Sequence, residues 1–171
     1  MKNDRPKITV PFETIDIVIE FVSITILLLM WIHLFIEYSS LPETVPVHFN
    51  ASGKPDNYGG KLFLLFLPFL ATVMYAGLFL LNRFPHLHNY MVNITEENAL
   101  VQYRFSSRVL RIVNLLCTLL FAYINYKIII GAKSNTSELG TWFLITVIGI
   151  SLLLPIFIFI YQRKLKNTSH G

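Results

Sequence analysis

Residues 17–36 read IVIEFVSITILLLMWIHLFI, an apolar block interrupted by a single acidic residue. Three further apolar blocks cover residues 62–81, 109–130 and 141–161. Each block has about 20 residues, and a helix of that length spans a hydrocarbon layer of about 30 Å. The blocks have almost no polar face, which a soluble amphipathic helix of this length needs. The sequence therefore predicts an all-α membrane protein, a bundle of four transmembrane helices.

The composition points to lipid and away from nucleic acid. Of the 171 residues, 54% are hydrophobic and 14% are charged, and the charges gather between the apolar blocks. The formal net charge is +4, but the basic residues flank the apolar blocks, as they do in membrane proteins. Cys117 is the single cysteine and lies inside a block, so it indicates neither a disulfide framework nor a metal cluster. Membrane lipids are expected partners, and nucleic acid is not.

The distribution of lysine and arginine predicts the orientation. Ten basic residues lie in the two ends of the chain and in the connection between the second and third blocks, and four lie on the opposite side: Lys54, Lys61, Lys127 and Lys133. Since basic residues accumulate on the cytoplasmic side, both termini are predicted to be cytoplasmic. Residues 1–16 then form a cytoplasmic arm, 17–161 the membrane domain and 162–171 a cytoplasmic tail. The connection 37–61 faces outward.

A helical pattern without proline or glycine runs from Thr95 into the third block. Three basic side chains on it share one face by their i, i+4, i+7 spacing: Arg104, Arg108 and Arg111. That face is expected to meet lipid phosphates at the inner surface, and a regulatory or partner-docking role is the alternative. Asp16 and Glu20 lie at the inner end of the first helix, at the same depth. We therefore expect them to form ion pairs with Arg108 or Arg111.

Residues 37–61, the motif loop, differ from a generic connection. Apolar Val45, Val47 and Phe49 alternate with Pro46, His48 and Asn50, which predicts a short extended segment with one apolar side. The stretches 50–53 and 54–57 have turn chemistry, and two glycines precede the second block. The motif loop is therefore predicted to be a compact, ordered cap on the outer ends of the helices.

The motif loop carries Leu-Pro, then Val-Pro-Val-His-Phe-Asn, then Gly-Lys-Pro-Asp, and a Gly-Lys that enters the second helix. This pattern resembles the family called domain of unknown function 1648. The resemblance rests on these positions: Pro46, His48, Phe49, Asn50, Gly53, Asp56 and Lys61. It implies a small multi-pass protein of the bacterial inner membrane, related to the front part of the immunity protein against the sporulation-delaying toxin. The longer chain and additional helices of that immunity protein are missing here.

Four polar side chains near the outer surface form a candidate metal or proton site: His33, Glu37, His48 and Asp56. Two histidines and two carboxylates at one membrane edge are able to bind zinc or pass a proton. Their spacing matches no metal signature. The structural alternative has Asp56 and His48 bonding within the motif loop, with His33 and Glu37 reaching toward water.

A polar stripe marks one face of the third helix: Asn114, Thr118 and Asn125. Polar groups in hydrocarbon tend to face other helices, where a hydrogen bond contributes about 0.6 kcal/mol. The stripe therefore predicts packing between helices, and a transport path is the alternative.

Three functions are open at this point. The first is a non-catalytic membrane protein whose outer loop binds a peptide, toxin or partner protein. The second is a small transporter or channel subunit, and the third is a metal-dependent membrane enzyme. The sequence has no phosphate-binding loop, nucleophile elbow, zinc-protease motif or dinucleotide fingerprint, so we expect no enzyme and no cofactor.

Overall fold

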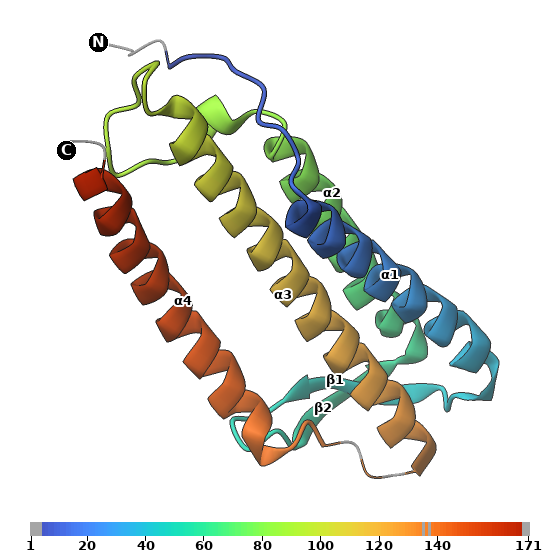
Figure 1. The fold of residues 1–171 in the computed structure, drawn as a ribbon. Helices are drawn as coiled ribbons and strands as arrows, with labels where there is room; N and C mark the ends of the chain where they lie inside the picture. Colours follow the sequence, from blue (N-terminus) through green and yellow to red (C-terminus); the bar gives the residue numbers. More distant parts are fainter. Residues whose placement is uncertain (1–4, 135, 137, 169–171) are drawn as a thin grey trace.

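The computed structural model describes residues 5–134, 136 and 138–168. Four helices dominate it: α1 Thr14–Glu37, α2 Phe66–Leu81, α3 Ala99–Ser134 and α4 Thr141–Thr168. Three short 3₁₀ segments join them: η1 Tyr38–Ser40, η2 Lys61–Leu65 and η3 Pro85–Leu87. Both ends of the chain lie at one end of the helices, the termini end (Figure 1). The opposite end carries two strands and is the hairpin end.

All four predicted membrane helices are present, each long and apolar enough to cross a membrane. Large apolar side chains cover their outer surfaces, because lipid accepts groups that water would reject. The chain therefore has the features of a multi-pass membrane protein. Helices α1 and α2 keep nearly the expected bounds, whereas α4 continues to Thr168, seven residues past the predicted 161. Helix α3 begins at Ala99, ten residues before the apolar block but within the helical pattern predicted from Thr95. Its 36 residues give a length of about 54 Å, so its first turns extend past the hydrocarbon layer.

The packed core contains three helices, not the expected four. Helices α1, α2 and α3 bury Leu27, Met30 and Ala71 at mid-length. Helix α4 stands apart from the other three in Figure 1, and none of its most apolar 18-residue stretch is buried. It touches α3 through two stacked ring pairs, with centroids 4.8 and 5.5 Å apart: Phe105 with Tyr161, and Tyr123 with Phe143. The bundle is therefore a three-helix core with a peripheral fourth helix.

A proline sets the start of α2. Pro68 has no N–H, so the carbonyl of Leu64, four residues earlier, loses its helical partner. The side-chain amide of Asn125 on α3 donates to that carbonyl at 3.2 Å. Here the helix passes from the 3₁₀ segment η2 into α2. The polar stripe on α3 thus supplies the hydrogen bond that proline removes from α2.

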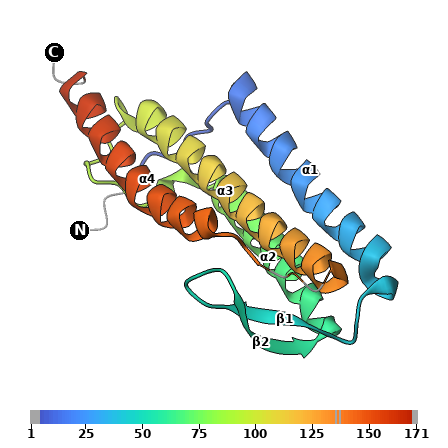
Figure 2. The same cartoon turned by 90° about the horizontal axis from the view of Figure 1, so that it is seen from below.

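The motif loop folds into a β-hairpin, which corrects the all-α expectation. Strand β1 Thr44–Phe49 pairs antiparallel with β2 Pro55–Gly60. The pairing is irregular on both sides of His48. The predicted alternation fails one step earlier, where Val45 and Pro46 are both buried. The hairpin lies across the ends of α2 and α3 (Figure 2). Its apolar side closes the core with Leu34, Leu64 and Ile129.

The hairpin tip also fixes where α4 begins. Gly53 turns the chain with a positive φ of 74°, and its carbonyl accepts a 2.8 Å hydrogen bond from the N–H of Leu139. The carbonyl of Leu139 in turn accepts a 2.7 Å bond from the hydroxyl of Tyr123 on α3. A Cβ on Gly53 would lie 3.2 Å from the carbonyl oxygen of Gly140. Glycine is therefore required by backbone conformation and by space.

Replacing Gly53 with alanine is expected to lower the free energy of unfolding by about 1 to 2 kcal/mol, because a left-handed conformation with a Cβ is strained. Thermal unfolding of the purified protein in detergent measures this change. Gly60→Ala is the matched control, since Gly60 has a φ of −63° and open space around its Cβ position. Equal effects of the two substitutions would show that the tip does not need glycine.

Candidate functional site

The turn of the hairpin is built by Asn50. Its side-chain oxygen accepts hydrogen bonds from the N–H groups of Ser52 and Lys54, at 2.9 and 3.1 Å. Its own N–H donates to the carbonyl of Lys54 at 2.8 Å. Asparagine favours such turns because its short side chain replaces backbone partners. The turn places Gly53 against the loop before α4.

A hydrogen-bonded pair and an ion pair brace the strands. Nδ1 of His48 lies 2.5 Å from Oδ1 of Asp56 across the hairpin. At the base, Nζ of Lys61 lies 2.8 Å from Oε1 of Glu43 and 5.3 Å from the ring centre of Tyr38. The N–H of Lys61 also donates to the carbonyl of Glu43. These polar positions of the motif loop all take part in the hairpin's own structure.

A family model named domain of unknown function (DUF1648) matches residues 25–72. A relative described as an uncharacterized protein of Archaeoglobus fulgidus is 32% identical over 143 residues, which are 77% of this chain and 78% of that protein. The chain belongs to the DUF1648 family. No solved structure matches it. The expected family is thus confirmed, whereas bacterial origin and a relation to toxin immunity stay predictions.

The DUF1648 match runs from the second half of α1 through the hairpin into the first half of α2. Beside it the hairpin end has an open cavity of about 400 Å³. The cavity lies between the strands and the loop that joins α3 to α4, and Lys54 and Glu138 bring opposite charges to its wall. Three prolines and an aromatic ring add rigid apolar surface: Pro42, Pro46, Pro55 and Tyr58. This is the candidate binding site at the hairpin end.

The four residues of the predicted metal or proton site are not brought together. His48 pairs with Asp56 on the hairpin, whereas Glu37 pairs with Lys133 of α3 at 2.5 Å. The ring of His33 lies 5.5 Å from that of Tyr126. Among the described residues, no three histidine, cysteine, aspartate or glutamate side chains are placed to hold a metal ion. Separate partners therefore hold the side chains apart.

The predicted polar stripe is buried and faces α2. Nδ2 of Asn114 donates to the carbonyl of Tyr75 at 3.3 Å, and Asn125 bonds Leu64 as described above. The hydroxyl of Thr118 donates to the carbonyl of Asn114, one turn earlier. The side-chain oxygens of the two asparagines have no hydrogen-bond partner in the described part of the chain. The donors of the stripe thus connect α3 to α2, as expected for packing.

The termini end holds the predicted ion pairs within a larger charge network. This network has three carboxylates from the start of α1 and three guanidinium groups from α3: Glu13, Asp16, Glu20, Arg104, Arg108 and Arg111. Nε of Arg108 lies 3.0 Å from Oδ1 of Asp16, and Nε of Arg111 lies 3.2 Å from Oε1 of Glu20. The basic face of α3 therefore forms ion pairs with α1, and contact with lipid phosphates is not its single role.

Asp16 is the centre of this network. Its side chain is 2% exposed and lies near guanidinium groups of both Arg108 and Arg111. It also accepts a 3.0 Å hydrogen bond from the N–H of Glu13, which completes a capping box at the start of α1. A carboxylate is favourable there because it satisfies free N–H groups and faces the positive end of the helix dipole. One buried aspartate thus both starts α1 and joins it to α3.

Sequence reasoning missed Glu13 and Tyr75. Glu13 binds Arg104 at 3.1 Å and Arg108 at 2.6 Å. The hydroxyl of Tyr75 on α2 donates to Oε2 of Glu20 at 2.9 Å. The spacing of Glu13 and Asp16, three residues apart before an apolar run, is a capping signal that would have found the first. The second lies inside an apolar block and gives no sequence signal.

His88 is also buried, although the sequence assigned it no role. Nε2 lies 3.1 Å from the carbonyl of Leu81, and Nδ1 lies 2.7 Å from the hydroxyl of Ser106. Burial lowers the pKa of His88, and nearby His86 lowers it further. Burial also raises the pKa of Tyr90 to about 12, so its hydroxyl stays protonated and donates to a backbone carbonyl. His88 therefore ties the connection after α2 to α3 in its neutral form.

Arg108→Gln is expected to lower the free energy of unfolding by about 3 kcal/mol, because among the described residues it leaves buried Asp16 with the 3.6 Å contact from Arg111 as its one ion pair. Arg104→Gln is the matched control and is expected to cost about 1 kcal/mol or less, since its partner Glu13 is 42% exposed. Denaturant unfolding in micelles measures both. Adding Asp16→Asn to Arg108→Gln should recover part of the loss; no recovery would contradict the pairing.

The free energy of unfolding of the wild-type protein is expected to fall as the pH drops below about 6.5, the unfolded-state pKa of histidine. The folded-state pKa of His88 lies below its unfolded value of about 6.5, so the unfolded chain binds the proton more readily. The contribution is present above the unfolded pKa and is lost as the pH falls through the folded pKa. Unfolding midpoints at pH 7.5 and 5.5 measure it. His88→Gln should flatten this dependence, and His86→Gln should keep it; the reverse would refute the assignment.

Proposed function

We propose that this DUF1648 protein is a non-catalytic, multi-pass protein of the cell membrane whose outward-facing hairpin end binds an extended peptide segment of a partner. The observation that carries the proposal is the open cavity beside the hairpin. At about 400 Å³ it falls within the range of ligand-sized sites. Both termini are cytoplasmic in this proposal, as the distribution of basic residues favours.

The chemistry of the cavity wall suits a peptide. Tyr58 is 57% exposed and offers a ring with a hydroxyl, a side chain common at recognition sites. Prolines on both strands keep the wall rigid, which limits the entropy lost on binding. Lys54 and Glu138 place a cation and a carboxylate on the wall. Together they favour one chain direction of a bound peptide, through its backbone dipoles or its charged side chains.

The hairpin adds a second means of binding. It has only two strands, so each strand has one edge outside the pairing. An extended peptide adds to such an edge by main-chain hydrogen bonds, and nearby pockets read its side chains. The family model covers both strands, which is consistent with a role for this end of the protein.

The test places a photoreactive benzoylphenylalanine at Tyr58 in cells. We expect a covalent adduct with one peptide segment of a defined partner, identified by mass spectrometry. Lys54→Gln is expected to lower the adduct yield up to about fivefold, the effect of losing one partly exposed ion pair. Phe63 is the matched control position, because it is apolar, half exposed and close by on η2.

Three results would contradict the proposal. Equal peptide adducts from positions 58 and 63 would indicate random collisions. Adducts with lipid alone would make the hairpin a membrane-facing cap. The third result concerns orientation and comes from thiol labelling of intact cells, with single cysteines placed in a Cys117→Ser background. If Asn89→Cys is labelled from outside and Ser52→Cys is protected, the hairpin lies in the cytoplasm.

A further inference from the structure

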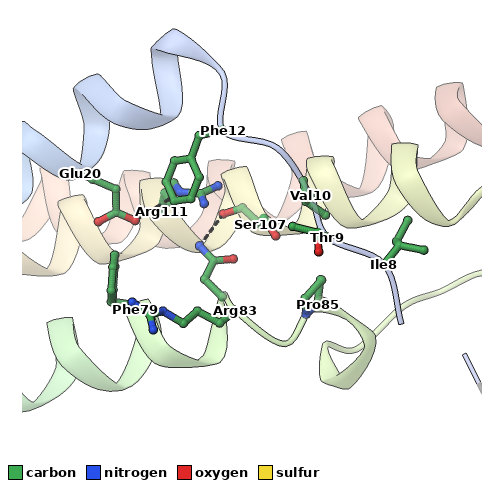
Figure 3. Close-up of a pocket in the computed structure, with 11 residues that line it drawn as sticks. Ile8, Thr9, Val10, Phe12, Glu20, Phe79, Arg83, Pro85, Ser107 and Arg111 are labelled. Carbon is green, nitrogen blue, oxygen red and sulfur yellow. Dashed lines mark hydrogen bonds and ion pairs between the residues drawn. The ribbon is translucent and has the colours of Figure 1, made fainter. Parts of the chain in front are cut away.

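A second cavity, of about 250 Å³, lies at the termini end. It is lined by the chain before α1, the first turns of α1, the end of α2 and the first half of α3 (Figure 3). Its volume corresponds to that of about eight water molecules and is below the usual range for drug-sized ligands. The space therefore suits a small polar group.

The depth of the cavity corresponds to the membrane surface. The apolar run of α2 ends at Leu81, and the next residue, Asn82, donates to the carbonyl of Ser107 at 3.0 Å. Helix α1 begins at Thr14, beside Arg108. From Ser107 to Ser134, α3 then rises about 40 Å, enough for the hydrocarbon layer and its interfaces. The cavity thus lies where lipid headgroups are found.

The charge of the wall is positive by one unit. Arg83 and Arg111 contribute two positive charges, and Glu20 contributes one negative charge. Glu20 is already bound by Arg111 and by the hydroxyl of Tyr75. Within the described chain, Arg83 has no carboxylate within ion-pair distance, and its guanidinium lies 5.2 Å from the ring centre of Phe79. Arg83 is therefore free to bind an anion.

A buried hydroxyl without a partner among the described residues also lines the space, beside a buried guanidinium. Ser107 is 1% exposed, and its hydroxyl has no hydrogen-bond partner among the described residues. Arg111 is 7% exposed and lies 4.4 Å from the ring centre of Phe12 (Figure 3). Its Nε, the atom nearest Glu20, makes no well-aligned hydrogen bond. An unsatisfied buried hydroxyl costs about 1 to 3 kcal/mol, a cost that an oxygen-rich ligand would remove.

We propose that this cavity binds the phosphate group of an anionic lipid headgroup, held by Arg83, Ser107 and Arg111. Phosphate oxygens accept hydrogen bonds from guanidinium and hydroxyl groups, and arginine binds them with two donors at once. The apolar part of the wall contacts the glycerol and the upper acyl chain: Ile8, Val10, Phe12, Phe79 and Pro85. The chain before α1 then closes over the headgroup.

The test uses the full chain purified in detergent and titrated with phosphatidylglycerol or phosphatidylcholine, with binding followed by native mass spectrometry. We expect one tightly bound phosphatidylglycerol per chain and weaker binding of phosphatidylcholine. Arg83→Gln is expected to weaken phosphatidylglycerol binding about fivefold, the effect of one basic group near anionic lipid. Ser107→Ala, which deletes only the buried hydroxyl, is expected to weaken it about tenfold.

Arg163→Gln is the matched control. Arg163 is an exposed basic residue on α4, and its guanidinium lies 5.6 Å from the ring centre of Phe159, the residue four positions earlier. Arg83 has the same relation to Phe79. The control should keep wild-type binding. Equal losses in the Arg83 and Arg163 variants, or equal binding of the two lipids, would overturn the proposal.

A parallel titration with glycerol phosphate and inorganic phosphate separates the two sources of phosphate. Saturable binding of either one that depends on Arg83 and Ser107, without selectivity for phosphatidylglycerol, would overturn the lipid assignment and keep the phosphate chemistry. Selective binding of the lipid, with weak competition by the soluble anions, is the expected result.

Discussion

A polar group inside a membrane needs a partner within the protein, because lipid offers none. In the three-helix core, buried polar groups find such partners at three depths along the helices. At the termini end, Asp16 is surrounded by guanidinium groups from α3. Near the hairpin end, Asn125 occupies the carbonyl that Pro68 leaves free. Between them, Asn114 and Tyr75 connect α3 to α2 and α2 to α1. Helix α3 is therefore the element to which the other core helices are tied.

Helix α4 is attached to α3 through aromatic ring contacts. The hairpin tip fixes its beginning through Gly53 and Leu139. An apolar helix gains little from packing on another helix in lipid, since the lipid tails are equally apolar. The hairpin thus has two structural tasks, closing the core and positioning α4, beside any binding at its surface.

The two ends of the protein differ in chemistry. The hairpin end has an open cavity with one cation and one carboxylate on its wall, and the DUF1648 match lies over it. The termini end has a neutralised charge network, one additional arginine and a small cavity lined by a buried hydroxyl without a partner among the described residues. We propose a peptide as the occupant of the first and a phosphate as the occupant of the second. Residues of α3 line both cavities.

The sequence by itself determined the four membrane helices, because length and continuous apolarity leave lipid as their solvent. It also predicted the ion pairs of Asp16 and Glu20, since charges at one depth in a membrane must neutralise each other. Only the tertiary structure decided that α4 stands outside the core, that His33 and Glu37 lie apart from His48, and that Tyr75 binds Glu20. These outcomes depend on which helix faces meet. Outside the polar stripe of α3, the apolar blocks carry little signal that selects one face over another.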